Sequence, residues 1–512
     1  MSINFSPNDP LAEALAPSRV VTPRANRTAA QAGFTFVGQT AEGEFEPGTP
    51  QHLFWQCREA ALLAVEVWER LNGPLTRWSA QTVNPKKLML VQDGGDQLNA
   101  GYDRASLAFF HHATGGHTTF SGASTDVVTH EAGHAFLDAV RPELFGTAST
   151  EDGAFHEAFG DSMALIVALS DADIRRALLT QSPDLGTTNF VATLMEDLAD
   201  GVKRARGATH PASKPREALN TFKFELPTTL PTTGGPDVLT SEVHSFSRIF
   251  TGCLYDLIRN LFTAGAAQDS AALLAASQTA GRMLIGAAKK APASLRFFQS
   301  VGRTMVLNDD AAGGQHREAI SVAFAQHGVF LGSSAVLMPR MALAGRAPSV
   351  HAGMKTAALA SDTLGDIRRR IDAPRGARMA VAAIDLGAAQ FVEAVHHREV
   401  ALGSLAKELK GVVAVAPESV IVGGSGGTAA AFSALPDPTS TTDEVLKFVE
   451  TLLAHERIDL GGRPRRAAAV RGRRALREAD GARTPVLPTH VVKTRGGKKI
   501  LTRVRFLCGC HC

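Results

Sequence analysis

The pentapeptide HEAGH at 130–134 combines residue types that can bind a metal ion and activate water. On a helix, residues four apart differ by about 40° in direction, so His130 and His134 can present their rings to one ion. Glu131 is then placed beside that ion. Zinc held by two histidines and a carboxylate keeps an open position for water, which a neighbouring glutamate can deprotonate. The pentapeptide therefore predicts hydrolytic metal chemistry.

The missing carboxylate is predicted in GAFHEAFGD at 153–161. Glu157, which follows His134 by 23 residues, could begin a second helix and complete the ligand set. Asp161 comes four residues later on the same face, where it could hold the second ring nitrogen of a ligand histidine. The alternative interpretation of this pair is two solvated carboxylates on a helix surface.

The elements that position these residues follow from periodicity. Apolar residues at helical spacing predict an amphipathic helix over 51–71, and short alternating runs between 87 and 120 predict a small sheet. From about 124 to 332 the spacing is mainly helical, so a helical lobe follows a sheet-bearing one. The parts that we predict are an irregular lead-in at 1–45, a sheet-bearing lobe with the zinc helix at 46–142, a helical lobe at 143–335, a linker at 336–375, a small α/β module at 376–460 and a basic tail ending in cysteines at 461–512.

Composition sets the broad class of the protein. The 512 residues are 44% hydrophobic and 20% charged, which is ordinary for a globular protein of several domains. The N-terminal sequence has no basic start followed by an apolar stretch, and no apolar run approaches membrane-spanning length, so we expect a cytoplasmic location without a membrane span. The five cysteines do not resemble a disulfide framework.

The charge is unevenly distributed. Residues 461–512 hold 14 Lys and Arg against 2 Asp and Glu, although the whole chain carries only +3. A solvated tail is the simpler interpretation, and docking on an anionic partner is the alternative. The terminal CGCHC could bind metal, and its role stays open. We expect removal of residues 461–512 to leave peptide hydrolysis intact.

The two chemical stretches resemble the thermolysin-like gluzincin metallopeptidases. The pattern of that family, DVVxHExxHAxxD followed by GAxNEAxxD, is similar to DVVTHEAGHAFLD at 126–138 and GAFHEAFGD at 153–161. The resemblance implies an α+β fold of two lobes over about residues 50–335, Zn²⁺ as cofactor and a peptide or protein substrate. It also implies His130, His134 and Glu157 as ligands, Glu131 as general base and Asp161 as the partner of a ligand. The family asparagine before the glutamate is His156 here.

Three further stretches are similar to the same family. NAGYDRASLAFF at 99–110 resembles the edge strand that binds an extended peptide, with Asn99 and Ala100 at the matching positions. His244 in SEVHSFSRIF resembles the histidine that stabilises the oxyanion, and Glu242 could orient it. Arg216 resembles the arginine that grips a substrate carbonyl, although surface arginines are common.

The sequence departs from the family at two points. Asp126 matches a calcium ligand, but the partner carboxylates are missing after Glu157, so a calcium site is doubtful and Asp126 is predicted to cap a helix. The interval 135–156 holds no tyrosine, so the second oxyanion donor of the family is absent there, and Tyr255 is not an evident substitute.

These observations predict a zinc endopeptidase in which Glu131 activates the water. The alternative from another class is a zinc-stabilised binding or scaffold protein that keeps the fold, and the presence of Glu131 argues against it. A Gly-rich stretch at 420–435 lacks the Lys-Ser/Thr of a phosphate loop and is predicted to be a structural turn.

Overall fold

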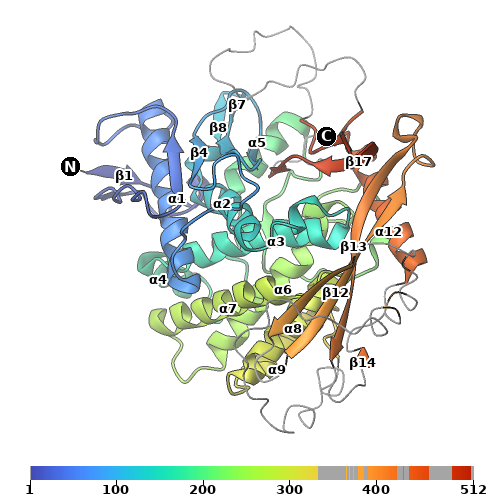
Figure 1. Ribbon diagram of the computed structural model, residues 1–512. Helices are drawn as coiled ribbons and strands as arrows, with labels where there is room; N and C mark the ends of the chain where they lie inside the picture. The colour runs from blue at the N-terminus through green and yellow to red at the C-terminus, as the bar shows by residue number, and fades with distance from the viewer. Residues whose placement is uncertain are drawn as a thin grey trace.

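Helices occupy the centre of the molecule and small sheets surround them, which makes this an α+β fold (Figure 1). The computed structural model describes residues 2–332, 379–385, 390–423, 430–431, 437–460 and 487–508, with the single residues 365, 368 and 373. The predicted linker thus lies almost wholly outside the described residues, as do the centre of the Gly-rich stretch and the basic run at 463–474. Among the described residues, no helix is both long enough and apolar enough to cross a membrane.

Four helices build the centre: α1 (Pro50–Asn72), α2 (Thr125–Val140), α3 (Thr150–Ala168) and α6 (Val243–Thr263). The helix predicted over 51–71 is confirmed as α1. Every side chain of α3 is buried, so this helix packs on all sides. Trp68 of α1 stacks on Phe136 of α2 with ring centroids 4.7 Å apart, which locks α1 against the helix that carries HEAGH.

A five-stranded sheet lies beside α2. Its order is β18 (Phe506–Leu507), β5 (Ala100–Tyr102), β6 (Ser106–Phe109), β4 (Lys87–Val91) and β3 (Gly33–Phe36). Tyr102 of β5 donates a hydrogen bond of 2.7 Å from its hydroxyl to Asp138 near the end of α2, so β5 is fixed to the HEAGH helix. The sheet predicted over 87–120 exists, but it is completed by strands from both ends of the chain.

The lead-in at 1–45, predicted to be irregular, contains short strands between longer irregular stretches. It forms β1 (Ile3–Phe5), which pairs antiparallel with β2 (Arg19–Val21), and it supplies β3 to the five-stranded sheet. Asp9 accepts hydrogen bonds from Ser124 before α2 and from the backbone N–H of Asp197. Strands of three or four residues are too short to produce a recognisable alternation, so they could not be predicted from the sequence.

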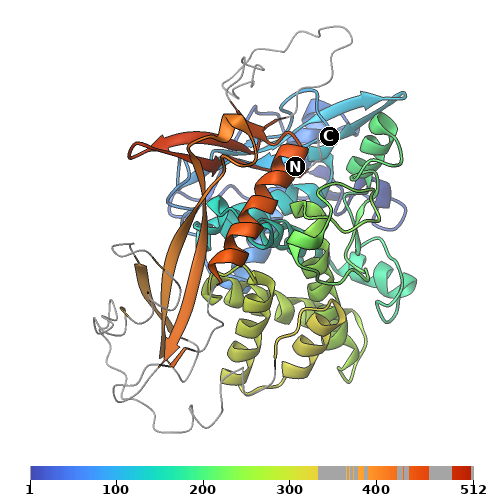
Figure 2. The same cartoon turned by 90° about the vertical axis from the view of Figure 1, so that its right-hand side faces the viewer.

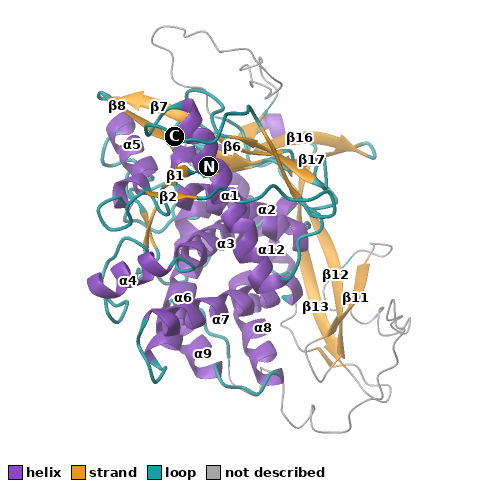
Figure 3. Cartoon of the chain, turned by 90° about the vertical axis from the view of Figure 1, so that its left-hand side faces the viewer, coloured by secondary structure: helices purple, strands orange, loops and turns teal. Residues whose placement is uncertain are grey.

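The remaining elements surround this centre. They are α4 (Ala172–Gln181), α5 (Glu196–Arg206), α7 (Ser270–Lys290), α8 (Phe297–Ala311), α9 (Arg317–Gln326), the hairpin β7 (His111–Thr114) with β8 (His117–Phe120), and the pair β9 (Thr193–Leu194) with β10 (Arg216–Glu217). Figure 3 shows α6 to α9 at one end of the molecule and β6, β7 and β8 at the other.

The C-terminal part forms one seven-stranded sheet with a helix. Its strands are β11 (Met379–Asp385), β12 (Gln390–Ala401), β13 (Val412–Gly423), β14 (Ala430–Ala431), β15 (Ile458–Asp459), β16 (His490–Arg495) and β17 (Lys498–Arg503), and its helix is α12 (Pro438–Ala454). We call these elements the C-terminal module. Figure 2 shows α12 lying against the helical centre.

The boundary predicted at 460 does not separate a tail from this module. β17 pairs with β13 and β16 pairs with β15, so residues 490–503 complete the sheet. Gly496 and Gly497 have φ of 56° and 78°, which a tight hairpin turn between antiparallel strands requires. Two apolar-containing runs joined by Gly-Gly, as in HVVKTRGGKKILTR at 490–503, are typical of such a hairpin. The basic charge of the whole segment favoured the interpretation as a tail.

Candidate metal centre

Helices α2 and α3 place three potential ligand side chains around one point. His130 and His134 lie one turn apart on α2, and Glu157 faces them from α3. Nε2 of His130 lies 3.3 Å from Oε2 of Glu157, and Nε2 of His134 lies 3.7 Å from the same oxygen. One ligand atom from each lies within 4.8 Å of the others, so the three residues could hold a metal ion.

The donor atoms fit a metal ion because they are buried without hydrogen-bond partners. Nε2 of His130, Nε2 of His134 and both oxygens of Glu157 make no hydrogen bond in the described part of the chain. Leaving such a group unsatisfied in the interior costs about 1–3 kcal/mol, and a bound cation would remove that cost. Burial opposes ionisation of Glu157, but the neighbouring histidines outweigh it and hold its pKa well below the usual range.

A carboxylate orients the first histidine. Nδ1 of His130 lies 3.0 Å from Oδ1 of Asp161, one turn after Glu157 on α3. The other oxygen of Asp161 accepts a hydrogen bond of 3.0 Å from the hydroxyl of Thr251 on α6. With Nδ1 held at Asp161, the ring of His130 presents Nε2 toward Glu157. The structure thus brings Asp161 to the position that the sequence predicted.

The second histidine is oriented by His156, to which the sequence assigned no role. Nδ1 of His134 lies 3.1 Å from Nδ1 of His156, which precedes Glu157. Burial holds the pKa of His156 well below its usual range, so this ring is neutral and its Nδ1 can accept the Nδ1–H of His134. The sequence signal for this contact was that His156, like the asparagine of the family, has a side-chain atom that can accept a hydrogen bond.

Two glycines let α2 and α3 approach closely at this point. A Cβ on Gly160 would lie 2.6 Å from the ring of His130, and a Cβ on Gly133 would lie 2.8 Å from the Cα of Gly160. Both distances are below any real contact of a side chain with backbone or ring. The glycine within HEAGH and the glycine within GAFHEAFGD therefore have a packing role beside the ligands.

Glu131 lies next to the ligands, and its carboxyl group has no hydrogen-bond partner among the described residues. It is fully buried, and neither of its oxygens makes a hydrogen bond in the described part of the chain. Burial raises the pKa of Glu131 to about 8, since the charged form has lost its water. A carboxyl group with a raised pKa in a buried site suits proton transfer near neutral pH.

A third helix brings His244 to the same place. Glu242 caps α6 by accepting hydrogen bonds from the backbone N–H groups of His244 and Ser245, and its other oxygen lies 2.7 Å from Nδ1 of His244. Nε2 of His244 is 3.3 Å from Oε2 of Glu157. Burial lowers the pKa of His244, but Glu157 and Glu242 outweigh it and the net shift is upward. His244 is thus held by Glu242, as the sequence suggested, with Nε2 directed at the centre.

Arg216 also reaches the centre, from β10. Its guanidinium lies 3.0 Å from Asp161 and 3.6 Å from Glu157, and a further contact of 3.5 Å reaches the sulfur of Cys508. The side chain is therefore engaged by the two carboxylates that surround His130. Its contact with a substrate carbonyl stays a prediction.

The strand β5 presents the predicted peptide-binding pair. Asn99 and Ala100 are both fully buried, and the side-chain oxygen of Asn99 accepts a hydrogen bond of 3.0 Å from the N–H of Ala100. The carbonyl of Ala100 accepts a hydrogen bond of 2.9 Å from the N–H of Cys508. An extended segment therefore lies on this strand, and it belongs to the C-terminal end of the same chain.

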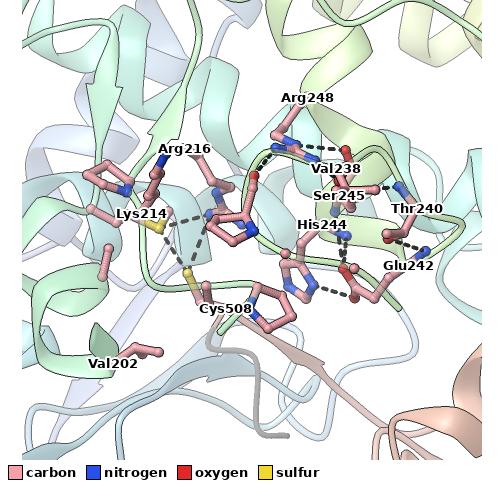
Figure 4. A pocket seen from close by; sticks show the side chains of 18 of the residues that line it. Val202, Lys214, Arg216, Val238, Thr240, Glu242, His244, Ser245, Arg248 and Cys508 are labelled. Atoms are coloured by element: carbon pink, nitrogen blue, oxygen red, sulfur yellow. Dashed lines mark hydrogen bonds and ion pairs between the residues drawn. The ribbon is translucent and has the colours of Figure 1, made fainter. Parts of the chain in front are cut away.

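A pocket opens beside the centre (Figure 4). Apolar side chains from the region of α5 form one part of its lining, namely Leu194, Met195, Leu198, Ala199 and Val202. Arg216, His244 and Cys508 form another part, and Figure 4 shows the sulfur of Cys508 pointing toward Arg216. The side chain of Cys508 thus lines the same pocket as these apolar side chains.

The helix cap predicted at Asp126 is wrong, and Tyr255 lies outside the centre. Ser124, and not Asp126, caps α2, because its hydroxyl accepts the N–H of Val127. Asp126 lies in the first turn, where burial and neighbouring carboxylates raise its pKa well above the usual range. The hydroxyl of Tyr255 donates to the carbonyl of Leu185 and so takes no part in the centre.

No protein-family model matches this chain, and a search of curated proteins gave no match. The resemblance to the gluzincin family therefore rests on the two quoted stretches and on the geometry of their side chains.

Proposed function

We propose that this chain is a zinc metallopeptidase of the thermolysin-like gluzincin type that hydrolyses internal peptide bonds. The observation that carries the proposal is the convergence of buried donor atoms from His130, His134 and Glu157 beside Glu131, whose oxygens make no hydrogen bond in the described part of the chain. Helix α2 has a sheet on one side and α3 on the other, and α6 packs on α3, which supports the two-lobed arrangement of that family.

The donor set favours zinc. Two imidazoles and one carboxylate leave an open position in a tetrahedral site, which is the arrangement of catalytic zinc. Bound there, zinc would polarise the carbonyl of the scissile peptide and lower the pKa of a water molecule. Asp161 and His156 hold the two imidazoles in the tautomers that direct Nε2 inward.

Three groups of the chain then serve the reaction. Glu131 accepts the proton of the attacking water and passes it to the leaving amine. His244 donates a hydrogen bond from Nε2 to the carbonyl oxygen as negative charge develops there. The edge of β5, with Asn99 and Ala100, holds the peptide extended, because a strand edge offers main-chain hydrogen bonds to any sequence.

A zinc-stabilised scaffold is the competing interpretation. It would require a site that is closed and satisfied, as structural zinc sites are. Glu131 argues against this, because a scaffold gains nothing from burying a carboxyl group whose oxygens make no hydrogen bond in the described part of the chain.

The proposal is tested by metal analysis and peptide cleavage on purified protein. We expect one zinc per chain and cleavage of a peptide library at internal bonds, detected by mass spectrometry, and Glu131→Gln should serve as the matched inactive control. Because residues 506–508 lie on β5, the assay should include the full-length double variant Phe506→Ala/Cys508→Pro. Bound zinc without cleavage in either protein would favour the scaffold.

A further inference from the structure

The last described residues of the chain lie inside the candidate site. Phe506, Leu507 and Cys508 are only 1%, 4% and 7% exposed, although they are close to the C-terminus. Phe506 pairs with Tyr102 and Leu507 with Gly101 in antiparallel register, which makes β18 the outer neighbour of β5. The edge of β5 that an added peptide would use is therefore already paired.

The main chain of this segment uses the two groups that a substrate would need. The N–H of Cys508 donates to the carbonyl of Ala100, at 2.9 Å. The carbonyl oxygen of Leu507 lies 2.7 Å from Nε2 of His244. The peptide bond between Leu507 and Cys508 thus stands where the proposed mechanism places a scissile bond, with its carbonyl at the oxyanion donor and its N–H on the strand.

The side chains of the segment fill the site on both flanks of that bond. Phe506 stacks on His134 and on His156, with ring centroids 4.6 Å and 4.2 Å apart. The sulfur of Cys508 belongs to a group of ligand-type atoms with His130 and Glu131 that lie within 4.8 Å of one another. An aromatic ring against one ligand and a thiol beside another leave little space for a second peptide.

The C-terminal module holds this segment in place. Two residues link β18 to β17, and the N–H of Val504 within that link donates to the carbonyl of Thr489. The module itself is joined to the helical centre by Arg296, which pairs with Glu151 of α3 and Glu444 of α12. A short tether to a docked domain gives a high effective concentration and a small entropy cost of binding.

We propose that Phe506–Cys508 is a built-in competitor, which occupies the peptide-binding edge of β5 and keeps other peptides out of the metal centre. This inference rests on the proposed function, because it describes how the proposed peptidase site is regulated. The module acts as the arm that delivers the segment, and activation consists of its withdrawal from β5.

Occupancy can be measured without hydrolysis, in zinc-loaded full-length protein that carries Glu131→Gln. We expect iodoacetamide to alkylate Cys508 about 100-fold more slowly than in the urea-unfolded chain, because the thiol is reached only by local opening. Peptide mapping assigns the label to that cysteine. Hydrogen exchange should show the amide of Tyr102 protected. Alkylation as fast as in the unfolded chain would overturn the inference.

A pair of double variants then tests the consequence. Phe506→Ala/Cys508→Pro removes the stacking ring and the N–H that binds Ala100, whereas Phe506→Leu/Cys508→Ala keeps an apolar side chain and that N–H. We expect the first variant to lose protection of Tyr102 and to gain about tenfold or more in kcat/KM toward an added peptide, since the open site is no longer a minor population. The second should keep the protection of Tyr102 and show a clearly smaller rise in kcat/KM, because its main chain still pairs with β5.

The outcomes separate this inference from the proposed function. If the first variant loses protection of Tyr102 but both variants have the same kcat/KM, the proposed role of Phe506–Cys508 as a competitor is overturned. Loss of the mass of residues 508–512 when zinc is added to the native chain would also overturn it, because the segment would then be a substrate that is cleaved at Leu507. A third outcome is slow alkylation of Cys508 and native protection of Tyr102 in zinc-loaded protein, with no hydrolysis in any variant. That result would support occupancy of the site and contradict the peptidase function.

Discussion

The two sides of the metal centre are built in different ways. The ligand side comes from α2 and α3, which follow each other in the chain and are separated only by residues 141–149. The peptide side comes from β5, α6 and β18, and the pair Leu507 and Gly101 is more than 400 positions apart. One side is local and buried on every face, whereas the other is assembled from distant segments.

This difference indicates which side can change without unfolding. The ligand side is packed around Gly133 and Gly160, so its side chains have no alternative position. On the peptide side, β18 contributes two paired residues to an edge strand and is connected through a short link. Release of β18 would expose a strand edge and break the main-chain pairs of two residues and the stacking of Phe506, but it would leave the packing of α2 on α3 in place.

Removal of a ligand should have the largest effect on the ligand side. We expect Glu157→Ala to lose most bound zinc and all measurable hydrolysis, because one of three protein bonds to the metal disappears. His130→Ala and His134→Ala should do the same. Elemental analysis after dialysis checks the zinc content, with Glu318→Ala on the exposed face of α9 as a control. Full zinc occupancy in Glu157→Ala would place the third ligand elsewhere.

Glu131→Gln should separate metal binding from catalysis within the ligand side. The amide cannot take a proton from water, so we expect hydrolysis to fall by roughly 10³-fold while zinc content stays at the native level. The measurement is peptide cleavage together with metal analysis on the same sample. Undiminished turnover would show that another group is the general base.

His244→Ala tests the peptide side. Its Nε2 is proposed to bind the carbonyl oxygen mainly in the transition state, so we expect kcat/KM to fall about 100-fold, mostly through kcat. Because Leu507 also uses this nitrogen, the assay should be made in the Phe506→Ala/Cys508→Pro background. Unchanged catalysis there would mean that the helix start at Glu242 has only a structural role.

His156 links the ligand side to the segment that covers it. We expect His156→Ala to weaken zinc binding by about tenfold, because the ring of His134 loses the acceptor for its Nδ1–H. His156→Asn restores a side-chain oxygen at this position and should recover part of the affinity. Competition with a chromophoric chelator measures both variants. Equal affinity in His156→Ala and the native protein would show that the contact between the two rings has no influence on the metal.

The smallest effect is expected on the outer face of the module. Lys498 and Glu399 form an exposed ion pair at 2.8 Å, with 61% and 44% of their side chains accessible. Such pairs contribute about 0.5 kcal/mol or less, so Lys498→Ala should leave unfolding in urea and peptide hydrolysis nearly unchanged. A clear rise in hydrolysis would show that this hairpin controls the position of β18.

Much of the ligand side could be predicted from the sequence. The spacing of His130 and His134 matches the period of a helix, and Glu157 and Asp161 have the same spacing, so each pair shares a face whatever the tertiary structure is. The helix at α1 and the helical lobe followed from the same periodicity. The link between His134 and His156 was missed, because it joins two helices and depends on their exact approach at Gly133 and Gly160.

The sequence by itself thus determined the residues that can bind the metal, since helical periodicity is a local property. Only the tertiary structure decided what lies on β5 and how far the module extends. The strands β1, β2, β3 and β18 are each four residues or shorter, and they are held by main-chain hydrogen bonds that every amino acid except proline can form. Such pairing leaves no pattern in the sequence, so the position of Phe506–Cys508 in the site emerged only from the folded chain.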